Sequence, residues 1–269
     1  MTKRFGFTLA EVLITLGIIG VVAAMTIPTL IANTNGAKFR SQFKKTLSTL
    51  NQAGLMSQAQ YDFDYAGATT ACTIGTGSKE KPDETMTFCA ILNGTLTGQT
   101  YIGAPTGLIR SNNGGEADYT WVSTTTAASG DDGAKLANGL QLKDTINYTL
   151  ADGSIVGFHK SAASCELAIG QQLTGAIIAK AGNSVTYDDK GVLTGGLGNC
   201  TGYIDVNGVT LPNKEVSCTD SKKTANAVET PCAVKNDANH MTDIFPVVFH
   251  DATVEPASAA AKYVLTSSK

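Results

Sequence analysis

A run of 26 residues without a charged side chain, residues 12–37, constrains this chain more than any other feature. The first part of it, residues 12–31, is mostly apolar. An α-helix rises about 1.5 Å per residue, so about 20 residues cross the roughly 30 Å of hydrocarbon in a bilayer. A cleaved signal peptide is the alternative, with Val22-Ala23-Ala24 as its cleavage site. Because the apolar run continues past that site, we favour a retained membrane helix.

The overall charge argues against one class of partner. The 269 residues carry 20 Lys and Arg against 23 Asp and Glu, for a formal net charge of −3. A domain that binds phosphate backbones is usually basic. We therefore expect no nucleic-acid partner.

The segment that leads into the apolar run carries a recognisable pattern. After the basic residues Lys3 and Arg4 comes Gly6-Phe7-Thr8-Leu9-Ala10-Glu11, and the apolar residues follow at once. This arrangement resembles the prepilin signal of type IV pilins and type II secretion pseudopilins, over about residues 1–60. Ala10 departs from the bulky aliphatic residue that is more frequent there in the family.

The resemblance implies a processing step and an orientation. A prepilin peptidase in the membrane would cut the Gly6–Phe7 bond on the cytoplasmic side and methylate the new amino terminus of Phe7. The N-terminus would then lie inside the cell. Charge alone leaves the orientation open, because basic residues flank the apolar run on both sides.

The resemblance also gives roles to four residues of the apolar segment. Glu11 would neutralise the amino terminus of a neighbouring subunit; its alternative role is to stabilise the N-terminus of its own helix. The stretch that contains Gly17, Gly20 and Pro28 would partly unwind on assembly. For each glycine alone, close helix packing is an equal alternative, whereas proline kinks or breaks a helix by itself.

Beyond the membrane segment, apolar residues continue at helical spacing. Phe39, Phe43, Leu47, Leu50 and Gly54 follow one another at intervals of 4, 4, 3 and 4. This predicts one long helix that ends near Asp62 and docks its second half on the protein's own sheet. The predicted fold is α+β: a long N-terminal helix packed on an antiparallel sheet with disulfide-closed loops.

The pattern of residues 63–269 predicts mainly strands and turns. Residues 146–150 and 154–158 flank Ala151-Asp152-Gly153, which predicts a hairpin, and 184–187 with 191–194 predict a second. Further expected strands are residues 85–92, 119–125, 203–206, 245–249 and 263–266. Residues 164–181 are expected to hold a short helix.

Six cysteines, all beyond the membrane segment, suit disulfides in an exported chain: Cys72, Cys89, Cys165, Cys200, Cys218 and Cys232. The sequence contains no C-x-x-C motif. Fifteen pairings are open, and sequence does not choose among them. Pairing of sequence neighbours is our working hypothesis.

No pattern indicates catalysis or a firm cofactor. The sequence lacks an H-x-x-x-H pair, a G-x-S-x-G elbow, a Walker loop and a dinucleotide fingerprint, so we expect no enzyme. Asp205 and Asn207 beside Gly208 are weak calcium candidates, with a plain turn favoured. Their segment also resembles the D-V-N-G…P-N segment of some pilin-like proteins, of which Asp243-Ile244-Phe245 would be the accompanying D-x-F.

Together these patterns predict three regions: a leader at 1–6, a helix at 7–62 with its membrane and assembly part at about 7–31, and a β-rich globular part at 63–269. The resemblance implies a subunit of a pilus or secretion pseudopilus, with itself, the prepilin peptidase and an inner-membrane assembly platform as partners. The precursor would cross the inner membrane once, and the filament would be periplasmic or extracellular. Alternatives are an adhesive minor or tip subunit and a membrane-anchored exported enzyme.

Overall fold

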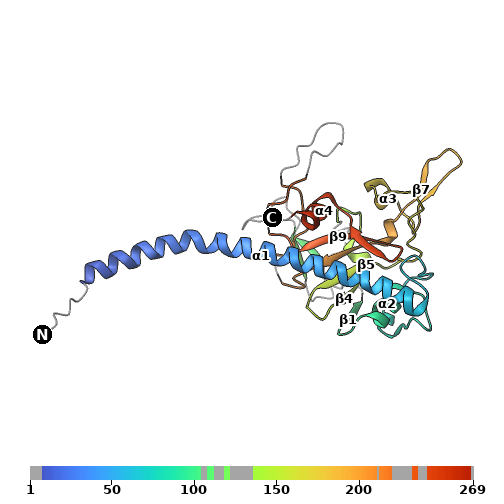
Figure 1. Ribbon diagram of the computed structural model, residues 1–269, viewed down its shortest axis with the longest axis horizontal. Helices are drawn as coiled ribbons and strands as arrows, with labels where there is room; N and C mark the ends of the chain where they lie inside the picture. The colour runs from blue at the N-terminus through green and yellow to red at the C-terminus, as the bar shows by residue number, and fades with distance from the viewer. Residues whose placement is uncertain are drawn as a thin grey trace.

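The computed structural model describes residues 8–103, 108–111, 118–121, 136–210, 212–219, 232–235 and 241–267. One long helix is followed by short helices and antiparallel strands (Figure 1). The fold is α+β, as the sequence predicts.

The long helix, α1 (Leu9–Tyr61), has two halves with different surroundings. Its first half projects away from the globular part, and its second half lies across it (Figure 1). The large side chains that the second half buries share one face: Phe39, Phe43, Leu47 and Leu50. The helix ends where Asp62 adopts the left-handed conformation, with φ 63° and ψ 24°. The predicted stripe and the predicted end are both confirmed.

A six-stranded antiparallel sheet forms the centre of the globular part, in the order β1-β4-β5-β8-β9-β10. Its strands are β1 (Thr100–Gly103), β4 (Thr145–Thr149), β5 (Ile155–His159), β8 (Thr201–Asp205), β9 (Ile244–His250) and β10 (Thr253–Pro256). Strands β4 and β5 form the first predicted hairpin, with Tyr148 opposite Val156. The second half of α1 packs mainly on β10 and β8 of this sheet.

Two small sheets lie outside the main one. Strand β2 (Leu108–Ser111) pairs with β3 (Asp118–Trp121), and β6 (Thr186–Tyr187) pairs with β7 (Leu193–Gly195). The β6–β7 pair confirms the second predicted hairpin, which projects from the globular part (Figure 1). Strand β3 covers the start of the strand expected at 119–125, and residues 122–125 lie outside the described residues.

Aromatic rings join α1 to the sheet. Phe43 of α1 stacks on Phe245 of β9 with ring centroids 4.2 Å apart. Phe88 stands within 5.3 Å of the rings of Phe158 and Phe249. All of these rings are fully or almost fully buried, so their burial is a main source of stability.

Helix α1 also covers the outer edge of the sheet. The side-chain oxygen of Asn51 accepts a hydrogen bond from the backbone N–H of Val254 in the edge strand β10. Backbone groups alternate sides along a strand, so the next outward nitrogen of β10 is that of Pro256, which has no hydrogen. The helix therefore caps this edge as well as burying its own apolar face.

Two segments that the sequence predicts as strands are helices. Residues 85–92 overlap α2 (Phe88–Thr95), and residues 263–266 belong to α4 (Ala259–Thr266). The hydroxyl of Thr87 accepts from the N–H of Ala90 at 3.0 Å, and that of Ser258 from Ala261 at 3.1 Å. These caps satisfy first-turn N–H groups, which favours a helix despite the strand-like composition. The short helix expected within 164–181 is α3 (Gly175–Ala179).

Three disulfides close loops of the globular part, in agreement with neighbour pairing. They join Cys72 to Cys89, Cys165 to Cys200 and Cys218 to Cys232. The first ties the loop after α1 to α2, and the second closes the excursion that carries α3 and the β6–β7 hairpin. Each bridge lowers the entropy of the unfolded chain and so stabilises the fold.

Candidate processing and assembly site on the N-terminal helix

The described chain begins at a reciprocal cap on α1. The hydroxyl of Thr8 accepts from the backbone N–H of Glu11 at 3.3 Å, and the Glu11 carboxylate accepts from the backbone N–H of Thr8 at 2.8 Å. The Thr8 hydroxyl also donates to this carboxylate at 2.8 Å. This is a capping box, which the T-x-x-E pattern of Thr8 and Glu11 indicates from sequence. Gly6 and Phe7, the predicted cleavage and methylation residues, lie outside the described residues.

The cap leaves part of the Glu11 carboxylate available. Both bonds from Thr8 end on the same atom, Oε2. Within the described part of the chain, Oε1 accepts no hydrogen bond, and the residue is exposed. The carboxylate therefore stabilises the start of its own helix and still offers an oxygen to a cationic group outside the subunit. The two predicted roles of Glu11 are geometrically compatible.

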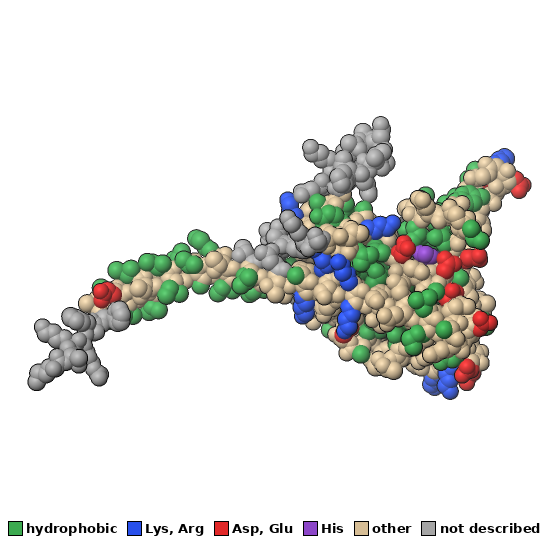
Figure 2. Space-filling model, viewed as in Figure 1, with side chains coloured by type: hydrophobic (Ala, Val, Ile, Leu, Met, Phe, Trp, Pro, Cys, Tyr) green, Lys and Arg blue, Asp and Glu red, His purple; other side chains and the backbone are tan. Residues whose placement is uncertain are grey.

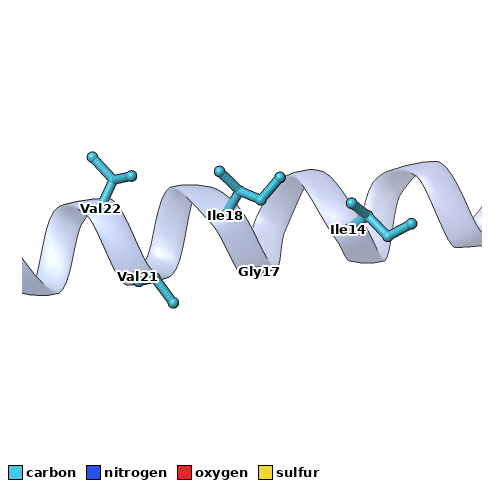
Figure 3. Close-up of a pocket in the computed structure, with 5 residues that line it drawn as sticks. All are labelled: Ile14, Gly17, Ile18, Val21 and Val22. Atoms are coloured by element: carbon cyan, nitrogen blue, oxygen red, sulfur yellow. The ribbon is translucent and has the colours of Figure 1, made fainter.

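The helix that carries Glu11 is apolar and uncovered. Between Leu9 and Pro28 it is long and apolar enough to cross a membrane, and the described chain buries none of it. Gly17 leaves a shallow apolar groove lined by Ile14, Ile18, Val21 and Val22 (Figure 3). A methyl group added at Gly17 or at Gly20 would meet no atom within 4 Å. The described residues of the subunit give no packing reason for either glycine, whereas another helix could approach closely there.

The predicted helix breaker does not interrupt α1. The helix runs without a break through Gly17, Gly20 and Pro28, and it is gently bent in its projecting half (Figure 1). Proline removes one backbone hydrogen bond from the turn before it. Unwinding of this stretch on assembly stays a prediction.

The weak calcium candidates lie in a turn and take part in its hydrogen bonds. Oδ1 of Asp205 accepts the N–H of Asn207 at 3.1 Å, and the amide of Asn207 donates to the carbonyl of Thr210 at 3.0 Å. These bonds are those of a turn stabilised by an aspartate side chain. Calcium binding by Asp205 and Asn207 stays a prediction, and these hydrogen bonds favour the alternative of a plain turn.

The same turn meets the distant D-x-F segment. The carboxylate of Asp243 accepts the backbone N–H groups of Asn213 at 2.9 Å and Lys214 at 2.7 Å. Its carbonyl accepts the N–H of Val206 at 3.0 Å. Burial raises the pKa of Asp243 to about 6, although the backbone hydrogen bonds act in the opposite direction. Hydrogen bonds of Asp243 thus join the D-V-N-G…P-N segment to the D-x-F segment, and we call this contact the joint. Sequence spacing alone did not reveal this role of Asp243.

One comparison with known proteins decides the identity of the N-terminal segment. The family model of the prokaryotic N-terminal methylation motif matches residues 1–27, which contain the predicted cleavage bond, Glu11 and most of the exposed apolar helix. The chain is type IV pilin-like. No curated protein and no solved structure matches it.

The motif places this pilin-like chain among membrane-anchored precursors and favours a structural role over an enzymatic one. The match covers the N-terminal segment only. In the globular part, the structure shows that the second half of α1 packs on the sheet.

Proposed function

We propose that the pilin-like chain is a structural subunit of a type IV pilus or of a type II secretion-like pseudopilus. It is made as a prepilin, cleaved after Gly6, methylated on Phe7 and polymerised through α1. The observation that carries this proposal is an apolar helix that bears the methylation motif and is left uncovered by its own globular part.

The chemistry of assembly follows from the first turn of that helix. Cleavage creates an amino group on Phe7, and an amine in an apolar filament core needs a counter-charge. Oxygen Oε1 of Glu11 in a neighbouring subunit supplies it, while Oε2 stays bound to Thr8. The small residues Gly17 and Gly20 let the helices approach closely enough to exclude lipid.

The proposed partners are those that such a subunit needs. They are other copies of the chain, the prepilin peptidase and methyltransferase, and an assembly platform in the inner membrane. The precursor crosses that membrane once with its N-terminus in the cytoplasm, and the filament is periplasmic or extracellular.

Intact mass spectrometry tests the processing step. The mature chain should correspond to residues 7–269 plus one methyl group, and its formal side-chain charge should change from −3 to −5 because Lys3 and Arg4 are removed. A mature chain that begins at Met1 or after Ala24 would contradict the proposal.

A pair of variants separates assembly from capping. Glu11→Gln removes the charge and keeps the shape of the side chain, whereas Thr8→Val removes the hydroxyl cap and keeps the charge. Blotting of sheared filaments should show none from Glu11→Gln and a substantial amount from Thr8→Val. Equal filament levels from the two variants would leave Glu11 with the capping role alone.

A second candidate function is favoured by the excursion that the Cys165–Cys200 disulfide closes. Its β6–β7 hairpin projects from the globular part (Figure 1). The excursion exposes large apolar side chains at Ile169, Tyr187 and Val192. An adhesive minor or tip subunit would present such an arm to a ligand. A major subunit dominates sheared filaments, whereas a minor subunit is scarce in them. The abundance of this chain in the sheared fraction therefore decides between the structural and the adhesive function.

A further inference from the structure

Charge is distributed unevenly along α1. Between Glu11 and Asp62 the helix has no acidic residue, and its basic residues, Lys38, Arg40, Lys44 and Lys45, lie within two turns. We call these four residues the basic collar. Figure 2 shows Lys and Arg side chains gathered where the helix enters the globular part, and acidic side chains toward the opposite end.

Most of the collar is not neutralised by the residues that the structure describes. Lys45 pairs with Asp152 at 3.1 Å. Lys38, Arg40 and Lys44 form no ion pair with any residue that the structure describes, and both lysines are exposed. The guanidinium of Arg40 donates to the carbonyl of Ser267 at 3.5 Å, which ties the end of α4 to the collar without changing its charge.

The helix fixes the height of the collar above the membrane. Ile31 is the last large apolar side chain exposed on the projecting half of α1. At about 1.5 Å per residue, Lys38 stands about 10 Å beyond Ile31, and Lys44 about 20 Å. The headgroup layer is about 5–8 Å thick on each side of the hydrocarbon. A lysine side chain can extend back to that layer, and the rest of the collar lies within about one or two Debye lengths of it.

We propose that the basic collar binds anionic phospholipid headgroups of the leaflet from which the globular part emerges. The inference needs only the membrane-anchored helix, and it does not depend on filament assembly. It gives the globular part a preferred resting position on the membrane surface before any partner is met.

A second copy of the chain is a poorer occupant for the collar. Asp62 marks the acidic end of the subunit, about 36 Å further along the helix than Lys38. Copies anchored in the same membrane share one height, so collars face collars and acidic ends face acidic ends. Lipid headgroups are the anionic partner that this geometry brings to every collar.

Lysine footprinting of the full chain in nanodiscs tests the proposal, with one copy in each disc. Acetylation by an amine-reactive ester should be slower at Lys38 and Lys44 in discs with 30% phosphatidylglycerol than in pure phosphatidylcholine, by about fivefold for each side chain held by headgroups. Lys81 and Lys190, outside the collar, are the internal controls. Salt at 0.5 M should abolish the difference, because the Debye length then falls to a few ångströms.

Matched variants complete the experiment. Lys38→Gln should weaken the lipid-dependent protection of Lys44, whereas Lys81→Gln changes the net charge equally and should retain it. Equal acetylation in the two lipids would overturn the proposal. Protection that depends on two copies per disc and not on lipid charge would overturn it in favour of contact between subunits.

Discussion

A single methyl group added at Gly54 should disturb the packing of α1 against the globular part. In an exposed helix, Gly→Ala stabilises by about 1 kcal/mol, because alanine loses less backbone entropy on folding. Here a methyl group on residue 54 would lie 2.6 Å from the carbonyl oxygen of Ala252 and 2.9 Å from the ring of Tyr65. Neither neighbour can move away easily, since the first is backbone and Tyr65 is fully buried with its hydroxyl bonded to the carbonyl of Leu50 at 2.8 Å.

The expected sign follows from the two opposing effects. Overpacking of a close contact costs about 1–3 kcal/mol, which exceeds the gain in helix propensity at the middle of that range. At the middle of that range, we therefore expect Gly54→Ala to destabilise the protein by about 1 kcal/mol. For a globular part of about 200 residues, each kcal/mol lowers the melting temperature by about 2–4 °C, so the drop should be about 2–4 °C.

Thermal unfolding of the detergent-solubilised full chain, followed by circular dichroism, measures this drop. Gly175→Ala is the matched control, because Gly175 is the first residue of α3 and a methyl group there would meet nothing within 4 Å. The control should keep or slightly raise the melting temperature. An unchanged or raised melting temperature for Gly54→Ala would refute the claim that α1 and the β9–β10 turn are in contact too close for a side chain.

Three further predictions concern the globular part. Because burial raises the pKa of Asp243 from 3.8 to about 6, the folded state holds that proton more tightly, and stability should fall by about 2 kcal/mol as the pH rises from 4 to 6; urea unfolding across this range should show the fall in the wild type and not in Asp243→Asn. Replacing Cys165 and Cys200 by alanine reopens a loop with a sequence separation of 35, and should lower the unfolding free energy by about 4 kcal/mol in the same assay. Since the hydrogen bonds described for Asp205 and Asn207 are those of a plain turn, exchanging EDTA for millimolar calcium should leave the melting temperature unchanged, and a rise of several degrees would establish a bound ion.

The features that sequence could predict are those with a long or strongly local signal. The apolar run and the stripe at Phe39 and Phe43 extend over many turns, so α1 and its buried face were predictable. The turn at Asp152-Gly153 carries its own hairpin chemistry. Helices α2 and α4 were missed because eight residues are too few to show helical periodicity, although Thr87 and Ser258 were readable as caps.

The candidate site divides in the same way. Glu11 and the cleavage motif are contiguous in sequence, so the resemblance to the prepilin signal was recognisable there. The joint between Asp243 and the turn at Asn213 links positions 30 residues apart. Only folding brings those groups together, because strand order decides which loops meet, and strand order is not encoded in local composition.

The closed edge at β10 limits how copies of this chain can associate. An open edge strand offers a row of N–H and C=O groups to which another chain can add a strand. At β10 the outward donor of Val254 is already taken by Asn51, and the next outward position is the hydrogen-free Pro256. Cross-subunit β-pairing, whether productive or amyloid-like, finds no donor at these two positions. Assembly through this side is therefore expected to rely on side-chain contacts more than on a shared strand.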